Sequence, residues 1–138
     1  MQELVRIGHP DVVAEFRDTW LQRTIDLFGR LGLDVSSEVA SDPFFGRVGR
    51  MLAANQRAQE LKFELLALIG GPEPTAIASF NAHQDHFSLI YGLETEGADV
   101  THTGCVAFGI ERITLALFRA HGMDVAQWPG EVGAELWP

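Results

Sequence analysis

The stretch Thr101–Phe118 joins an apolar run, a glycine and two charged residues, and it is the segment best suited to chemistry. Its first half predicts a buried strand and its second half a helix. Gly109 between them lets the backbone turn without a Cβ clash. Glu111 and Arg112 then fall in the first helical turn, where free N–H groups and the helix dipole favour anions. An arginine there can pair with a phosphate or stack on an aromatic ring, which predicts a nucleotide site. A strand–helix corner with a solvated arginine is the alternative.

Two further groups of polar residues could line a site. The segment Asn81–His86 holds His83, Asp85 and His86 within four positions, which suits a metal loop or an acid–base pair. A hydrogen-bonded turn with exposed histidines explains it equally well. Lys62 and Glu64 fall on one face of a predicted strand, either as polar site residues or as a plain ion pair.

Composition limits the class of protein. The chain has 138 residues, 46% of them hydrophobic, which predicts one domain with a substantial core. No apolar run is long enough to span a bilayer, and we expect no signal peptide. The single cysteine, Cys105, excludes an internal disulfide and suits a reducing cytoplasm, where a lone buried cysteine is usually a small apolar residue.

The charge balance argues against nucleic acid as a partner. Ten Lys and Arg face nineteen Asp and Glu, giving a net charge of −9 and a pI of about 4.8, whereas nucleic-acid binding needs a basic face. Arg47, Arg50, Arg57 and Lys62 lie close together in the sequence, and the pattern favours an ordinary solvated face.

Hydrophobic periodicity and turn residues predict an α+β fold, an antiparallel sheet with helices on one side. We expect a helix capped by Asp11 and running to about Leu31, and a second helix that ends at Gly122. A Gly-Pro connection predicts a hairpin between two of the strands. The expected strands are 3–7, 33–40, 61–69, 75–81 and 100–108, and residues 70–74 form the hairpin connection. The expected helices are 11–31, 48–58 (helical or irregular) and 110–120. Residues 123–138 are expected to form a tail.

The run Thr101–Phe118 also resembles motif 3 of the class II aminoacyl-tRNA synthetases. Ser41–Gly49 and Ala78–Phe87 resemble blocks of the amino acid:[carrier protein] ligases, which are relatives of the atypical zinc-dependent seryl-tRNA synthetases. Three blocks in the right order are far more specific than one. The resemblance runs from about Glu3 to about Gly122.

The resemblance implies the C-terminal half of a class II catalytic domain, with a core over residues 1–122 and a tail over 123–138. The chain begins at about the second strand of motif 2. Motif 1, the first strand of motif 2 and the arginine that holds the α-phosphate have no counterpart in this sequence. We therefore expect a homo-oligomer, or a partner that supplies the missing half.

The same resemblance implies roles for individual residues. Arg112 would stack on adenine and reach the terminal phosphate of ATP, and Lys62, Glu64 and Glu111 would lie near ATP and its Mg²⁺. Asn81, His83 and Asp85 would lie along the amino acid pocket. Asp42 and Arg47 flank Phe44-Phe45 in a block that the ligases share, without a role that chemistry assigns.

A zinc ion would take Glu3 and Cys105, which stand where the ligases have two of their three ligands. The remaining cysteine ligand has no counterpart, and His83, His86 or His102 are the candidates for another ligand.

The implied activity is formation of an aminoacyl-adenylate from ATP and a small amino acid, followed by transfer to a carrier-protein thiol. No side chain need act as a nucleophile, because catalysis would come from positioning and charge stabilisation. The alternative is a truncated or repurposed paralogue that serves as a binding, regulatory or biosynthetic-partner module. The acidic balance argues against tRNA as the acceptor.

Overall fold

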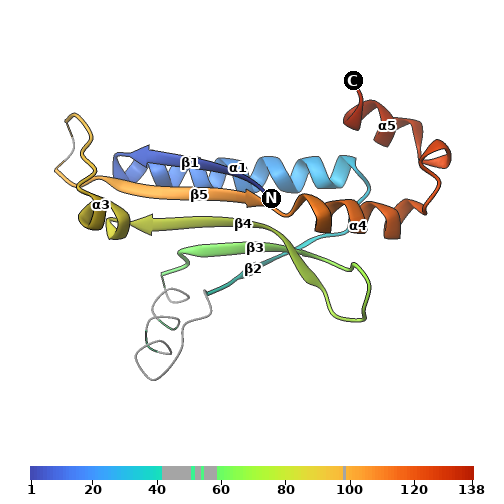
Figure 1. Cartoon of the computed structure of the whole chain (residues 1–138), viewed down its shortest axis with the longest axis horizontal. Helices are drawn as coiled ribbons and strands as arrows, with labels where there is room; N and C mark the ends of the chain where they lie inside the picture. Colours follow the sequence, from blue (N-terminus) through green and yellow to red (C-terminus); the bar gives the residue numbers. More distant parts are fainter. Residues whose placement is uncertain (42–50, 52–53, 55–58, 98) are drawn as a thin grey trace.

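Five antiparallel strands form one sheet of order β1-β5-β4-β3-β2 (Figure 1). The computed structural model describes residues 1–41, 51, 54, 59–97 and 99–138. The strands are β1 (Gln2–Gly8), β2 (Ser36–Val39), β3 (Lys62–Ala67), β4 (Thr75–Gln84) and β5 (His102–Phe108). The predicted α+β fold with an antiparallel sheet is confirmed.

The cross-strand register sorts the side chains into two faces. Leu4, Val106, Phe80 and Phe63 are aligned across four strands, and Phe80 and Val106 are fully buried in the core. Two rows flank this one: Val5, Cys105, Asn81 and Lys62 on one side, and Glu3, Ala107, Ser79 and Glu64 on the other. Because successive side chains in a strand point to opposite faces, one face forms the core and the other is largely polar.

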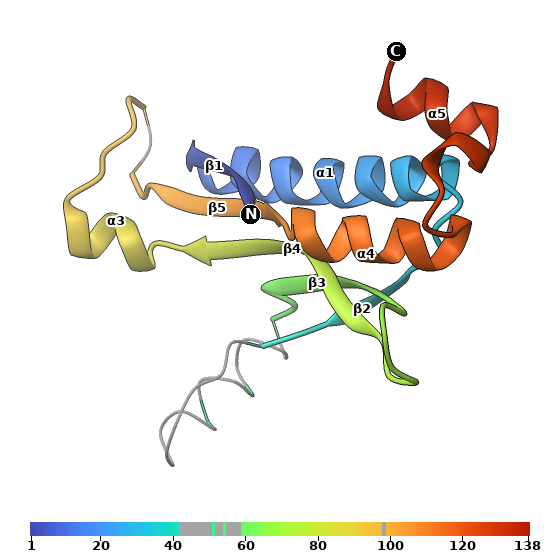
Figure 2. The same cartoon turned by 45° about the vertical axis from the view of Figure 1, so that its right-hand side comes forward.

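Helix α1 (Pro10–Arg30) packs against β4 and β5 and covers the core face (Figure 2). Its buried residues are Val13, Thr24 and Phe28. The predicted cap was wrong: His9 occupies the N-cap, its side chain makes no capping hydrogen bond to the helix, and Asp11 lies in the first turn. Pro10 starts the helix because its missing N–H would be unpaired there anyway.

The close approach of α1 to the sheet depends on Gly104. A Cβ added at this position would lie 2.8 Å from Val13 Cγ1 and 2.9 Å from the carbonyl oxygen of Asn81. Neither neighbour is the free end of a long side chain, so any larger residue must push α1 or β4 away.

The remaining helices are α3 (His86–Tyr91), α4 (Ile110–His121), the 3₁₀ turn η1 (Val125–Gln127) and α5 (Gly130–Leu136). The expected tail thus carries η1 and α5. Val132 of α5 is 2% exposed and belongs to the main core, and Arg30 of α1 pairs with Glu135 at 2.9 Å. That guanidinium holds the pKa of Glu135 below its usual range. The proposed division of the chain at residue 122 stays a prediction.

Two expected elements differ from the structure. The strand expected over 33–40 spans only Ser36–Val39. The polar loop expected after Asn81 is instead the end of β4 followed by α3, because the strand keeps its pairing with β5 as far as Gln84. The expected element 48–58, most of the 41–49 block, and the residues Asp42, Arg47, Arg50 and Arg57 lie outside the described residues. None of the described helices has the length and apolar character needed to cross a bilayer.

We expect Gly104→Ala to lower the free energy of unfolding by about 1–3 kcal/mol, the usual cost of overpacking a core. Urea denaturation followed by circular dichroism measures this value. Gly29→Ala is the matched control, since a Cβ there meets nothing within 4 Å. Because Gly29 lies in α1, the control should be neutral or more stable by up to about 1 kcal/mol. Equal stability of Gly104→Ala and the wild type would contradict the close-approach argument.

Candidate functional site

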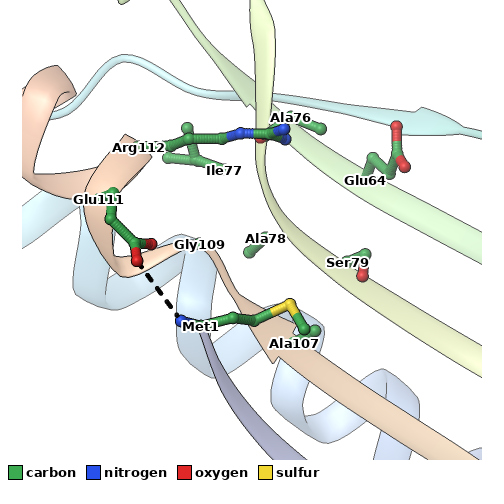
Figure 3. Close-up of a pocket in the computed structure, with 10 residues that line it drawn as sticks. All are labelled: Met1, Glu64, Ala76, Ile77, Ala78, Ser79, Ala107, Gly109, Glu111 and Arg112. Atoms are coloured by element: carbon green, nitrogen blue, oxygen red, sulfur yellow. Dashed lines mark hydrogen bonds and ion pairs between the residues drawn. The ribbon is translucent and has the colours of Figure 1, made fainter.

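A cavity of about 320 Å³ lies where β4 and β5 meet the start of α4 (Figure 3). Its lining combines small residues with charged ones. The small residues are Ala76, Ala78, Ser79, Ala107 and Gly109, the charged ones are Glu64, Glu111 and Arg112, and Met1 and Ile77 complete the wall. Small side chains leave room for a flat ligand, and the charges can fix its polar end.

Arg112 is held at one side of this cavity. It is the third residue of α4, and its Nη1 donates to the carbonyl oxygen of Ala76 at 2.8 Å. In Figure 3 the side chain extends from α4 across to β4. One hydrogen bond uses one of the five guanidinium N–H groups, so the others can donate to a ligand. The predicted placement of Arg112 near a helix N-terminus agrees with this geometry.

Gly109 is required for a different reason than the one expected. Its φ is −78°, which any residue adopts, but an added Cβ would lie 3.3 Å from the carbonyl oxygen of Ile77. The Gly109 N–H donates to that same oxygen at 2.9 Å. The glycine therefore lets the start of α4 lie close to β4, which in turn brings Arg112 to Ala76.

Glu111 lies on the opposite side of the α4 start from Arg112. One of its carboxylate oxygens is 3.7 Å from the Met1 amine (Figure 3). Its own backbone N–H, followed by this amine, lowers the pKa of the exposed carboxyl below its usual range. Glu111 is therefore ionised at neutral pH.

Lys62 and Glu64 share the polar face, as predicted, and form an ion pair of 3.3 Å. The side chains of Lys62 and Glu64 are 12% and 27% exposed, so the pair is more buried than the exposed one considered from the sequence. Glu64 lines the cavity, and Lys62 is aligned with Asn81.

Asn81, His83 and Cys105 meet on the polar face. Asn81 Nδ2 donates to Cys105 Sγ at 3.3 Å, and His83 Nε2 lies 3.6 Å from the same sulfur. The pairing of β4 with β5 shifts between Ala82 and Gln84, so His83 is the extra residue of a β-bulge. Such a bulge re-aims a side chain, and here it puts the imidazole beside Cys105.

Burial raises the pKa of the Cys105 thiol to about 11. Glu3 acts in the same direction, by a hydrogen bond and by its charge, whereas the hydrogen bond from Asn81 acts against it. Glu3 therefore lies close to Cys105, while their joint role as zinc ligands stays a prediction. The thiol is protonated at neutral pH, which makes it a poor nucleophile.

Zinc fits the described residues poorly. In the described part of the chain, no three His, Cys, Asp or Glu residues gather in a way that could hold a metal. Cys105 would release its proton on binding zinc, because a zinc-bound cysteine is a thiolate. Glu3 and Cys105 remain two candidate ligands, short of the three or more that a zinc site needs.

Asp85 is separated from the other predicted substrate residues. It occupies the N-cap position of α3 without a side-chain capping hydrogen bond, and it lines another hollow, of about 460 Å³, with residues of the 88–101 segment. Sequence reasoning also missed Thr103, whose Oγ1 lies 3.2 Å from His83 Nδ1, and the small residues of the cavity floor. The small residues Ala76, Ala78 and Ser79 within one strand were the available signal for that lining.

The raised pKa predicts slow alkylation of the native chain. At pH 9 a thiol of pKa about 11 is about 1% thiolate, against half for the ordinary value of 9.0. We expect iodoacetamide to react about 50-fold more slowly with the native chain than with the urea-unfolded chain, and the gap to close as the pH rises past 11. Mass spectrometry gives a clean readout because Cys105 is the single cysteine. Equal rates at pH 9 would contradict the burial argument.

Several known ligases are similar to this chain in sequence. Amino acid–[acyl-carrier-protein] ligase 1 of Bradyrhizobium diazoefficiens is 47% identical over 133 residues, covering 96% of this chain and 41% of the relative. Ligase 2 of the same organism is 47% identical over 130 residues, covering 94% and 39%. Type-2 serine–tRNA ligase of Methanococcus aeolicus is 28% identical over 132 residues, covering 92% and 25%. No protein-family model matches the chain.

Solved structures show the same fold. The M. kandleri SerRS in complex with A. aeolicus tRNASec superimposes with a TM-score of 0.76 at 21% identity, over 97% of this chain and 27% of that one. The RNA binding domain of threonyl-tRNA synthetase from Cryptosporidium parvum gives 0.62 at 13% identity, over 87% and 37%. The chain spans about two fifths of the length of the two ligases. The predicted resemblance is thus confirmed: over nearly its whole length, this chain is similar to part of the amino acid–[acyl-carrier-protein] ligases and has a class II synthetase-like fold.

Proposed function

We propose that this chain forms the nucleotide- and amino acid-binding face of an ATP-dependent amino acid ligase. The reaction would be formation of an aminoacyl-adenylate from a small amino acid, followed by transfer to a carrier-protein thiol. The observation that carries the proposal is Arg112, fixed at the start of α4 beside a cavity floored by alanines, in a chain 47% identical to two such ligases.

ATP suits the cavity in size and chemistry. A volume of about 320 Å³ lies in the range of small-molecule sites. The adenine ring would lie between the guanidinium of Arg112 and the alanine floor, held by cation–π attraction. Remaining N–H groups of Arg112 and the N-terminus of α4 would contact phosphate oxygens.

Mg²⁺ would accompany the nucleotide and neutralise phosphate charge. Glu64 and Glu111 are the carboxylates that line the cavity, and Mg²⁺ commonly takes one or two carboxylates together with substrate phosphates. The Lys62–Glu64 ion pair orients the Glu64 carboxylate. Without Mg²⁺ these carboxylates would repel the phosphates.

The amino acid would lie along the neighbouring row of the polar face. Asn81 and His83 project there beside Cys105, two residues along the strand from Ser79 in the cavity, which is a spacing of about 7 Å. Glu3 would face the substrate amine. This arrangement would hold the carboxylate of the amino acid next to the nucleotide, so catalysis by this chain would be positioning.

A non-catalytic or repurposed binding module is the second candidate. Among the described residues that line the cavity, Arg112 is the single guanidinium, and one cation stabilises a pentavalent phosphate poorly. Activation would then need further positive charge at the α-phosphate besides Arg112. The single cysteine suits a cytoplasmic protein.

We expect Arg112→Ala to weaken ATP binding by about 1–3 kcal/mol, the cost of losing charge-assisted contacts. Titration calorimetry with ATP and Mg²⁺ measures the affinity. Arg119→Ala is the matched control, because Arg119 lies two turns further along α4 and donates to the carbonyl oxygen of Ile69. Equal affinities for the wild type and Arg112→Ala would remove Arg112 from the nucleotide site.

We also expect the 138-residue chain alone to give no amino acid-dependent exchange of pyrophosphate into ATP. Activation needs more positive charge at the α-phosphate than Arg112 provides. The assay uses radiolabelled pyrophosphate with glycine, alanine or serine, and the reaction without an amino acid is the blank. Exchange well above the blank would show that another cation, such as Arg6 or Arg47, supplies that charge.

A further inference from the structure

Two strained backbone positions lie close together at one end of the β3–β4 pair. Among the described residues, Glu60 and Gln84 are the non-glycine residues with positive φ, at 50° and 53°. This left-handed conformation is unfavourable for residues that carry a Cβ. Glu60 precedes β3 and Gln84 ends β4. The two segments are joined there, because the Ala82 N–H donates to the carbonyl oxygen of Leu61 at 2.8 Å.

Gln84 completes the bulge that contains His83. Ala82 is paired with Gly104 and Gln84 with Thr103, which leaves one extra residue in β4. A bulge that needs a left-handed residue is commonly built with glycine, which adopts positive φ without a steric cost. A glutamine keeps this conformation only where its surroundings hold it in place.

The side chain of Gln84 has a contact that can hold it. Its Nε2 donates to Oε1 of Gln59 at 2.9 Å, and Gln59 is the neighbour of Glu60 in the turn before β3. The carbonyl oxygen of Glu60 accepts from Arg17 Nη1 at 2.8 Å. The guanidinium carbon of Arg17 also lies 5.1 Å from the ring centroid of Phe63. Helix α1 therefore holds the turn, and the turn holds Gln84.

The bulge decides where the His83 imidazole lies. Its Nδ1 is 3.2 Å from Thr103 Oγ1, and its Nε2 is 3.6 Å from Cys105 Sγ. In regular pairing His83 would be opposite Thr103 and diagonal to Cys105, at about 7–8 Å. The bulge turns the ring toward the sulfur. An imidazole with a partner at each nitrogen favours one tautomer.

We propose that Gln84 is a positioning residue of the polar face: its left-handed conformation, held by the Gln59 amide, turns the His83 imidazole onto Cys105. Gln84 acts through His83 and does not itself contact the substrate. The consequence for amino acid binding rests on the proposed function, in which His83 lies along the substrate. The placement of the ring does not rest on it.

Two substitutions at this one position test the proposal. Gln84→Gly permits positive φ without a steric cost, so the imidazole should stay in place. Gln84→Val introduces a β-branched residue that opposes positive φ, so the bulge should rearrange. Nitrogen-15 NMR of the histidine rings reads the tautomer, in metal-free buffer at about pH 8, above the ordinary imidazole pKa. His83→Gln identifies the His83 signals.

We expect one protonated and one unprotonated ring nitrogen for His83 in the wild type and in Gln84→Gly. Gln84→Val should lose this pattern and give the averaged signals that the ring shows in urea. Gln2→Val is the matched control and should keep the pattern. Gln2 is exposed and paired with Phe108 at the other end of β5, where valine suits the extended strand. Circular dichroism checks that each variant is folded.

Gln59→Ala tests the holding contact without any change in β4. It should move the His83 signals toward the averaged ones in the wild-type background and leave them unchanged in the Gln84→Gly background, because glycine needs no holding contact. Averaged signals in the wild type would overturn the proposal. So would an unchanged pattern in Gln84→Val or Gln59→Ala, or its loss in Gln84→Gly, in Gln2→Val or on adding Gln59→Ala to Gln84→Gly. No nucleotide or amino acid is present, so a failure to bind ATP would count against the proposed function alone.

Discussion

The antiparallel pairing of β4 with β5 is the constraint on which the rest of this structure depends. One register sets Phe80 against Val106 in the core and Asn81 against Cys105 on the polar face. Since side chains alternate along each strand, a slip of one residue would exchange the two faces. The same pairing brings the Gly109 N–H into a hydrogen bond with the carbonyl oxygen of Ile77. This contact sets where α4 begins. Burial of Phe80 and Val106 therefore determines where Arg112 and Cys105 lie.

The glycines of β5 and the α4 start make this pairing compatible with close helix packing. The missing side chain of Gly104 leaves space for Val13 of α1 on the core face, and that of Gly109 leaves space for the carbonyl oxygen of Ile77. The core face is thereby covered by α1, while the polar face keeps a cavity floored by alanine. The cavity arises because small side chains leave space there, and Glu111 and Arg112 at the start of α4 bring charge to it.

Charge is unevenly distributed over this acidic chain. Cations that serve the structure donate to nearby acceptors, as Arg30 does to Glu135 and Arg112 to Ala76. Surface ion pairs of this kind contribute little to stability, so their main effect is to orient a side chain. Arg6 and Arg23 have a different environment, between aromatic residues and solvent.

The sequence by itself determined the five strands, the two longest helices and the strand–helix junction before Arg112. Apolar alternation and glycine positions predicted the strands, the two long helices and the α+β class, and the motif blocks predicted the ligase resemblance. Arg112 could be placed at a helix start because Gly109, three residues before it, separates the predicted strand from the predicted helix. The bulge at His83, the separation of Asp85 and the packing of Val132 could not be predicted. Those features depend on contacts between residues distant in the sequence, such as Arg112 with Ala76 and Cys105 with His83, and only the register of the folded sheet decides such contacts.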